Sequence, residues 1–376
     1  MHLSRLHLRN YRNFAEQVLE LPAQGAAIVG DNGQGKTNLL EAVYYLEIFR
    51  SFRGAPDEQL VRFGEDVFRV EGRLEDADGR TRTVSAAFDR RGRKKKVAVN
   101  GAEPERLGDA LGQVAAVIFS PGDVELVSGG PGGRRRFLDI VLSLAEPGYL
   151  LALQRYRQAL SQRNNLLRQN SPRALVELWD EGLVAAGSRV AAARAAWVRE
   201  HAESFAVHYA RVAGGHPGHM AYAPSAPELG EAGSAAEVAA AFGTALARSA
   251  DREQRRGMTL VGPHRDDLRF TVAGADGAAL ELRTYGSGGQ QRTAAIALRM
   301  VEAETIHAVR GREPIILLDD VFAELDPGRS QRIVDWIENE EGGGQVLLTS
   351  PKPTDFRLRG ETLPRWGIRD GVVLAG

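Results

Sequence analysis

The sequence predicts an α/β fold of mixed sheets with a helical insertion domain, and three observations support this prediction. A short apolar run at residues 26–29 leads through a glycine-rich loop into residues 36–49, where apolar side chains recur at helical spacing. A second apolar run, within residues 314–320, ends at two adjacent carboxylates. Residues 129–256 are rich in alanine, leucine and arginine and poor in strand patterns, which is typical of packed helices.

Composition places the chain among large globular proteins. Its 376 residues are 43% hydrophobic and 26% charged, which is enough for a large core and one to three domains. It has no run of about 18 apolar residues and no apolar signal core in its charged first segment, so we expect a cytoplasmic protein without a membrane span. Cysteine is absent, which excludes disulfides and cysteine zinc sites. The net charge is −1, so binding to nucleic acid would need a local basic face.

The glycine-rich loop matches the phosphate-binding pattern G-x-x-x-x-G-K-[ST]. Glycines at 33 and 35 let the backbone wrap around phosphate with its amides inward, and the following helix adds its positive N-terminal end. Lys36 supplies a charge for the outer phosphates, and Thr37 supplies a hydroxyl for magnesium. An ordinary glycine turn before a helix is the alternative. We therefore predict ATP and Mg²⁺ as cofactors, bound by the loop residues Gly30, Asp31, Asn32, Gly33, Gln34, Gly35, Lys36 and Thr37.

Two carboxylates follow the apolar run at 315–318. In open α/β sheets the carboxyl ends of the strands face the ligand crevice. Asp319 is expected to bind magnesium, directly or through its water, and Asp320 is expected to orient or deprotonate the attacking water. An acidic pair after a strand can also cap a helix or close a turn, but its occurrence together with the phosphate loop favours catalysis. The predicted catalytic residues are Asp320, Lys36 and, by the argument that follows, Ser287.

A Ser-Gly-Gly-Gln sequence precedes a predicted helix over residues 290–304. It matches the signature motif of ABC ATPases, in which this serine and the helix start meet the γ-phosphate of ATP bound to the other subunit. The motif therefore predicts a two-fold, ATP-bridged homodimer, in an ABC-type P-loop ATPase head. A simple linker turn is the alternative. The residues expected to bind nucleotide across the dimer are Ser287, Gly288, Gly289 and Gln290.

The segment after the carboxylates continues the ABC pattern. Residues 323–326, Ala-Glu-Leu-Asp, stand where the D-loop passes along the dimer interface, and a helix is predicted from Pro327. A last strand is predicted at 345–349. It delivers Thr349 and Ser350 to the position of the switch residue, which is often histidine in this class. The absence of histidine leaves the identity of the γ-phosphate sensor open.

Five further motifs give the chain a resemblance to the RecF family of bacterial recombination and gap-repair ATPases, on the structural-maintenance-of-chromosomes side of the ABC class. The resemblance covers nearly the whole chain, and the last two of these motifs distinguish the family from transporter ATPases. Ala323 departs from the serine that the family often carries there, a change that we expect to be tolerated. The motifs are residues 8–14, 32–38, 120–127, 132–139 and 262–268.

The resemblance implies properties that spacing and periodicity do not give. These are ATP-dependent dimerisation, weak DNA-dependent ATP hydrolysis, and binding to DNA at single-strand gaps or on duplex. The resemblance also implies cooperation with RecR and RecO in recombinase loading, and roles in the SOS response and replication restart. It gives an ATPase head at 1–128 and 257–376 (domain I) and a helical lobe II at 129–256.

Two basic segments are candidates for contact with DNA. Residues 89–96 place six cations around Gly92, which is typical of an exposed hairpin tip, and residues 134–173 contain eight arginines. Ordinary solvated surfaces are the alternative in both cases. We find no aromatic interleaving in the sequence that would indicate base stacking. His264 is expected to be structural, near an interface or domain joint, and His216 and His219 are expected to be exposed.

Two other functions compete with an ATP-gated DNA clamp. One is a transporter-type ATPase subunit, which the lack of an evident coupling glutamine near residues 119–121 and the arginine-rich insertion disfavour. The other is a repair ATPase with nuclease activity, for which the sequence offers no additional acidic metal cluster.

Overall fold

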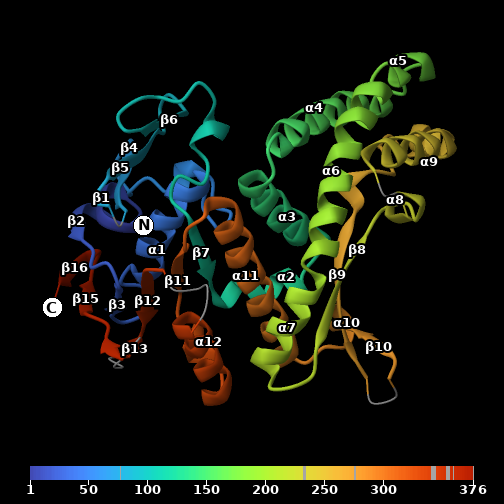
Figure 1. Ribbon diagram of the computed structural model, residues 1–376. Coiled ribbons are helices and arrows are strands. Elements are labelled where there is room, and N and C mark those ends of the chain that lie inside the picture. The colour runs from blue at the N-terminus through green and yellow to red at the C-terminus, as the bar shows by residue number, and fades with distance from the viewer. Residues whose placement is uncertain are drawn as a thin grey trace. The chain divides into compact units, whose positions relative to one another are not determined.

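The structure is a computed structural model that describes residues 1–76, 78–231, 234–274, 277–339, 344–352, 356–358 and 360–375. It contains two compact units (Figure 1). The first comprises Met1–Asp123 and Glu302–Gly376, and the second comprises Val124–Val301. Helix α11 (Gly288–Arg310) continues from the second unit into the first.

A six-stranded sheet forms the centre of the first unit, in the order β16-β15-β3-β12-β11-β7. All neighbouring strands are parallel except β15 and β16. The inner strands are nearly continuous apolar runs because parallel strands are covered on both faces. Helices α1 (Lys36–Ile48) and α12 (Pro327–Asn339) follow two of them. The strands are β3 (Gly25–Val29), β7 (Ala116–Phe119), β11 (Ile315–Leu318), β12 (Val346–Ser350), β15 (Arg365–Arg369) and β16 (Val372–Ala375).

The first unit also contains a five-stranded antiparallel sheet, in the order β2-β1-β4-β5-β6. Exposed and buried residues alternate along β4, so one face packs on the core and the other meets solvent. Phe68 packs edge-on against Tyr11 and Tyr45 inside that core. The strands are β1 (His2–Tyr11), β2 (Phe14–Glu20), β4 (Val67–Glu75), β5 (Thr81–Asp89) and β6 (Lys94–Val99). A two-stranded ribbon, β13 (Arg357–Leu358) and β14 (Glu361–Thr362), completes the described strands of this unit.

The β5–β6 hairpin corrects one detail of the sequence prediction. Its turn spans only residues 90–93, because β6 already begins at Lys94. The basic run therefore divides between a turn and the first half of a strand, where alternate side chains point to opposite faces.

The second unit is mainly helical. Helices α4, α6 and α9 pack against one another, and α3 packs against α4 and α6 (Figure 1). Packing is close at Gly187 of α6, where an added Cβ would lie 2.6 Å from Phe242 and 2.9 Å from Tyr156. The helices are α2 (Glu125–Ser128), α3 (Pro131–Ala145), α4 (Tyr149–Arg168), α5 (Arg173–Glu177), α6 (Asp180–Glu200), α7 (Ala202–Ala213), α8 (Glu228–Glu231), α9 (Ala235–Arg256) and α10 (Leu282–Tyr285).

A three-stranded sheet that the sequence analysis did not anticipate completes the second unit. Strand β9 (Asp267–Ala273) pairs with β8 (Gly218–Ala223) and β10 (Ala279–Glu281). This pairing ties segments on both sides of residue 256 together, so the compact units divide at 123/124 and at 301/302. The division into domains at 128/129 and 256/257 stays a prediction. No helix in the described ranges has the length and apolar character that crossing a bilayer requires.

Candidate nucleotide-binding site

The loop after β3 has the backbone that phosphate binding requires. Gly33 and Gly35 have φ angles of +84° and +112°, in the left-handed region that side chains disfavour. A Cβ on Gly35 would also lie 2.5 Å from the side-chain amide nitrogen of Asn13. Helix α1 begins at the next residue, and Gly35 provides no side-chain cap for it. The first amides of α1 therefore have no side-chain acceptor and can donate to an anion.

Lys36 lies folded across this loop, with its side chain only 4% exposed. Its ammonium donates to the carbonyls of Gly30 at 2.8 Å and Asp31 at 3.2 Å. The same nitrogen lies 3.8 Å from a carboxylate oxygen of Asp320. Because β3 and β11 end at the same edge of the sheet, the loop cation and the strand carboxylate meet there.

Thr37 and Asp319 are in direct contact. The Thr37 hydroxyl lies 2.8 Å from Oδ1 and 3.0 Å from Oδ2 of Asp319, and so connects the start of α1 to the end of β11. Burial raises the pKa of Asp319, and the hydrogen bonds from Thr37 and Thr349 oppose that shift. A hydroxyl and a carboxylate at this separation are the oxygen donors that Mg²⁺ prefers. This pair is therefore able to hold a magnesium ion.

Thr349 fixes the second carboxylate. Its hydroxyl oxygen accepts a hydrogen bond from the Asp320 amide at 2.9 Å and lies 3.0 Å from Oδ1 of Asp319. Asp320 has a φ of +47°, which is uncommon for a non-glycine residue and is held here by that amide contact. The sequence placed Thr349 at the switch position but gave it no partner. The strand order β12-β11, which the sequence did not predict, supplies that partner.

Both ends of the chain support the loop at Gln34. Asn13 donates its side-chain amide to the Gln34 carbonyl at 2.9 Å and accepts from Asn38 at 2.9 Å. The amide of Asp370 donates to the Gln34 side chain at 2.6 Å, and the amide of Gly371 donates to the Gln34 carbonyl at 3.1 Å. Sequence analysis missed these contacts because they join residues far apart in the chain.

The Ser-Gly-Gly-Gln motif lies in the second unit, whereas the phosphate loop and both carboxylates lie in the first. Ser287 accepts from the Gln290 amide at 3.2 Å, and the Gln290 side chain accepts from the Ser287 amide at 2.9 Å. This reciprocal capping box fixes the serine at the N-terminus of α11. The expected role of Ser287, Gly288, Gly289 and Gln290 in binding nucleotide stays a prediction.

Two arginines expected in a DNA footprint serve the interior of the second unit instead. Arg134 is 1% exposed and pairs with both oxygens of Asp267, at 2.7 and 3.0 Å. Arg163 is 2% exposed and pairs with Asp180 and Glu253. The expectation of a phosphate footprint is therefore wrong for these two residues, because buried cations need internal partners.

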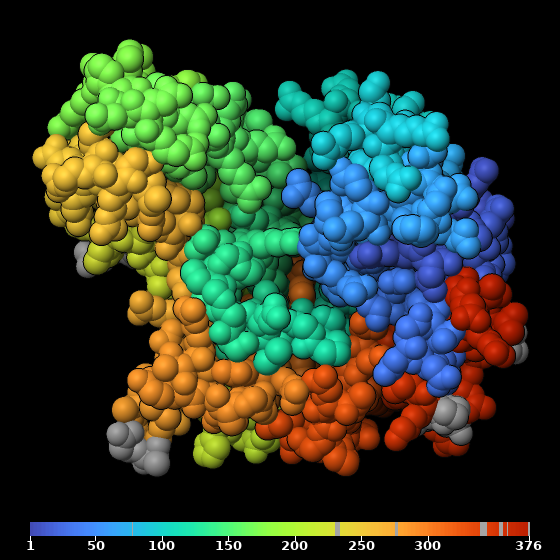
Figure 2. All heavy atoms as spheres, turned by 180° about the vertical axis from the view of Figure 1, so that it is seen from behind, coloured from blue at the N-terminus to red at the C-terminus, as the bar shows by residue number. Residues whose placement is uncertain are grey.

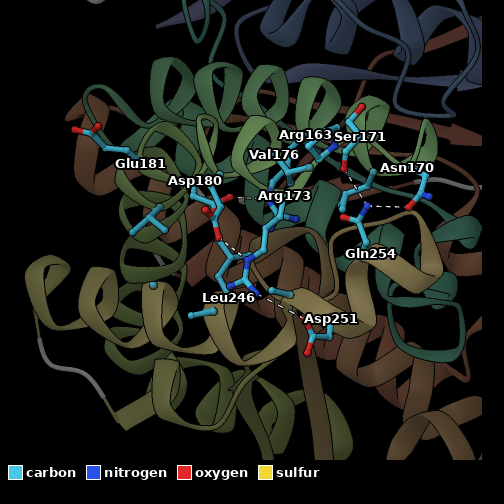
Figure 3. Close-up of a pocket in the computed structure, with 17 residues that line it drawn as sticks. Arg163, Asn170, Ser171, Arg173, Val176, Asp180, Glu181, Leu246, Asp251 and Gln254 are labelled. Atoms are coloured by element: carbon cyan, nitrogen blue, oxygen red, sulfur yellow. Dashed lines mark hydrogen bonds and ion pairs between the residues drawn. The ribbon is translucent and has the colours of Figure 1, made fainter.

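Arginine–carboxylate pairs also line a pocket of about 780 Å³ between α4, α5, α6 and α9. Figure 3 shows Arg163 and Arg173 among the carboxylates that line it. Arg173 pairs with Glu177 at 2.6 Å and lies 3.7 Å from Asp251. These ion pairs leave little free positive charge in the pocket.

His264 is a structural residue, as expected, and it lies inside the second unit. The Tyr156 hydroxyl donates to its Nδ1 at 2.6 Å, and its Nε2 donates to the Thr259 carbonyl at 3.1 Å. Burial lowers the pKa of His264 to about 4, so the imidazole is neutral at pH 7. His216 and His219 are exposed, as predicted, although His219 lies within β8 rather than in a loop.

The architecture and the site together define a P-loop ATPase head, and comparison with known proteins identifies the family. The RecF/RecN/SMC N terminal domain family matches residues 2–363. "DNA replication and repair protein RecF" of Halothermothrix orenii is 37% identical over 383 residues, covering 99% of this chain and 98% of the relative. The protein of the same name from Synechococcus sp. (strain JA-3-3Ab) is 39% identical, covering 93% and 91%. The chain belongs to the RecF family.

Solved structures agree with that assignment. The recombination mediator protein RecF with ATP, of the RecFOR pathway, superposes with a TM-score of 0.89 at 31% identity, covering 100% of this chain and 97% of that one. An Smc head domain from Pyrococcus furiosus reaches a TM-score of 0.56 at 16% identity, which supports the fold alone. The predicted ABC-type α/β head and the resemblance to RecF are confirmed, and no comparison favours a transporter subunit.

Replacing each of the two loop glycines by alanine should lower the free energy of unfolding by different amounts. We expect Gly35→Ala to lower the free energy of unfolding by about 2–3 kcal/mol, because it combines backbone strain with the clash against Asn13. Gly33→Ala is the matched control, since a Cβ there meets nothing within 4 Å and only the strain of about 1 kcal/mol remains. Urea unfolding of both variants measures the difference, and equal losses would contradict the clash.

His264 should make stability depend on pH. Its pKa is lower in the folded state than its ordinary value of 6.5, so its contribution is present above pH 6.5 and is lost as the pH falls towards 4. Between pH 7 and 4.5 we expect wild type to lose on the order of 2–3 kcal/mol more unfolding free energy than His264→Gln, which keeps an acceptor and a donor. Parallel urea titrations at the two pH values test this, and equal losses would show that the imidazole is not held neutral.

Proposed function

We propose that this protein is a weak, DNA-dependent and Mg²⁺-dependent ATPase of recombinational gap repair that dimerises around ATP on DNA. The contact between Thr37 and Asp319, with Lys36 beside Asp320, is the observation that carries this proposal. It joins a phosphate cradle to a carboxylate pair in one site, which is the arrangement that nucleotide hydrolysis needs. Membership of the RecF family supports the repair function.

Each residue of the site has a task that its position supports. The loop amides and Lys36 bind the phosphates, and Thr37 with Asp319 would hold a magnesium ion, which neutralises charge on the phosphate oxygens. Asp320 orients the attacking water and accepts its proton. Thr349 positions Asp320 through the hydrogen bond to its amide. Groups that are held in place by hydrogen bonds in this way need little reorganisation during the reaction.

The Ser287 motif supports a dimer. The capping box holds the serine at the positive end of a 23-residue helix, where an anion is favourably bound. Ser287 belongs to a different unit from the phosphate loop. We propose that it closes over ATP held by the partner subunit, which makes ATP part of a two-fold interface.

The remaining parts of the proposal follow the family. RecF is named as a recombination mediator of the RecFOR pathway in the solved structures, which supports RecR and RecO as partners of this chain. Recombinase loading, the SOS response, replication restart and a cytoplasmic location are proposed on the same ground.

Two substitutions separate binding from hydrolysis. Lys36→Ala is expected to lose ATP binding, because the loop then lacks its cation, and to stay monomeric. Asp320→Asn is expected to keep ATP binding and to accumulate as the dimer, because the water is no longer activated. Light scattering with and without ATP measures both. A wild-type protein that stays monomeric with ATP would contradict the proposal.

A further inference from the structure

The pocket between α4, α5, α6 and α9 has an apolar floor. Its volume of about 780 Å³ is in the range of sites that bind ligands or side chains of a partner. Leu167, Val176 and Leu246 line it and are 3%, 3% and 2% exposed. A floor recessed in this way accepts an inserted apolar side chain. Figure 2 shows this part of the second unit at the surface, with α9 in gold beside the green helices.

The rim of the pocket is acidic. Four carboxylates and two arginines line it, which gives the lining residues a net charge of −2. Arg163 is buried in its own ion pairs, and Arg173 pairs with Glu177 at 2.6 Å. Glu181 is exposed, and the Asp251 side chain is 83% exposed. The rim therefore attracts cations and repels phosphate, so the pocket fits a cationic partner and not nucleic acid.

The walls of the pocket favour a helical occupant. Every residue that lines it belongs to a helix or to the loop 170–172. Helical backbone groups pair within their own helix, so these walls offer no strand edge to which an extended peptide could add. A segment that lies in the groove satisfies its own backbone groups best as an α-helix. One end of the groove is fixed, because the Gln254 amide donates to the Asn170 side chain at 2.9 Å and to the Ser171 carbonyl at 3.0 Å (Figure 3).

Helix α5 extends the apolar surface beyond the pocket. Its Leu175 is 47% exposed, and Leu178, directly after the helix, is 76% exposed. These leucines lie about one helical turn apart and flank the pocket residues Val176 and Glu177 in the chain. Exposed apolar residues beside an apolar groove are typical of a surface that another protein covers.

We propose that this pocket, together with the leucines of α5, docks a basic amphipathic helix of a partner protein. Apolar side chains of that helix fill the floor, and its lysines or arginines pair with Glu177, Glu181 and Asp251. The incoming cation displaces Arg173, whose pair with Glu177 is exposed on both sides and therefore contributes little stability. The inference goes beyond the proposed function, because the pocket lies wholly within the second unit and uses no residue of the nucleotide site.

Two labelled helical peptides of about 15 residues serve as probes, with the same leucine stripe flanked by lysines in one and by glutamates in the other. Fluorescence anisotropy with the full chain, without ATP or DNA, should show binding of the lysine peptide alone. Ala247→Trp fills the pocket from an exposed position of α9 and should weaken that binding at least about tenfold, as expected for one lost leucine anchor. Ala236→Trp, at an exposed position of the same helix outside the pocket, is the matched control and should bind as wild type does.

A gain of affinity provides a second test that a misfolded variant cannot imitate. Arg173→Ala should strengthen binding of the lysine peptide about two- to fivefold, because it removes the cation that competes for Glu177 and Asp251. Asp251→Asn should weaken binding by a similar factor.

Three results would overturn the inference. The first is a wild type that binds neither peptide or binds both equally, and the second is an Ala247→Trp variant that binds as tightly as wild type. The third is a dimer that forms without ATP and dissociates in Ala247→Trp, which would assign the pocket to a second copy of the chain.

Discussion

The hydrogen bond between Thr37 and Asp319 is the interaction on which the rest of the site depends. It joins the first turn of α1 to the first residue after β11, two positions that are 282 residues apart. The parallel order β3-β12-β11 makes this possible, because all three strands end at one edge of the sheet. Thr349, at the end of the middle strand, contacts both carboxylates from there. One sheet edge therefore assembles the loop cation, the candidate metal ligands and the candidate base.

A second constraint is the division of the nucleotide-binding motifs between two units. The candidate phosphate loop of the first unit is supported at Gln34, by the side chain of Asn13 and by the backbone amide of Asp370. The signature serine belongs to the second unit, at the start of a helix that runs on into the first.

The sequence predicted the elements that carry strong local patterns. Strands β3 and β11, helix α1 and the paired carboxylates were predicted because apolar periodicity and the glycine loop are local signals. It missed β8, because that strand is defined by its pairing with β9 rather than by its own pattern. It also misplaced Arg134 and Arg163 on the surface, because composition does not reveal which cations have buried partners. Thr349 gained its significance only from the neighbours that the fold gives it.

The central claim is that one protomer's serine completes its partner's site, and mixing two inactive variants tests it most directly. Asp320→Asn lacks the candidate base, and Ser287→Arg cannot close over the partner's ATP. A heterodimer of the two nevertheless contains one intact site, which combines Asp320 of the Ser287→Arg protomer with Ser287 of the Asp320→Asn protomer. Combined in equal amounts before ATP is added, they should recover about one quarter of wild-type ATPase activity, since half the two-fold dimers are mixed and each has one working site of two. Ser234→Arg, at the equivalent cap of α9, should hydrolyse ATP normally. A mixture as inactive as its separate components would contradict the shared site.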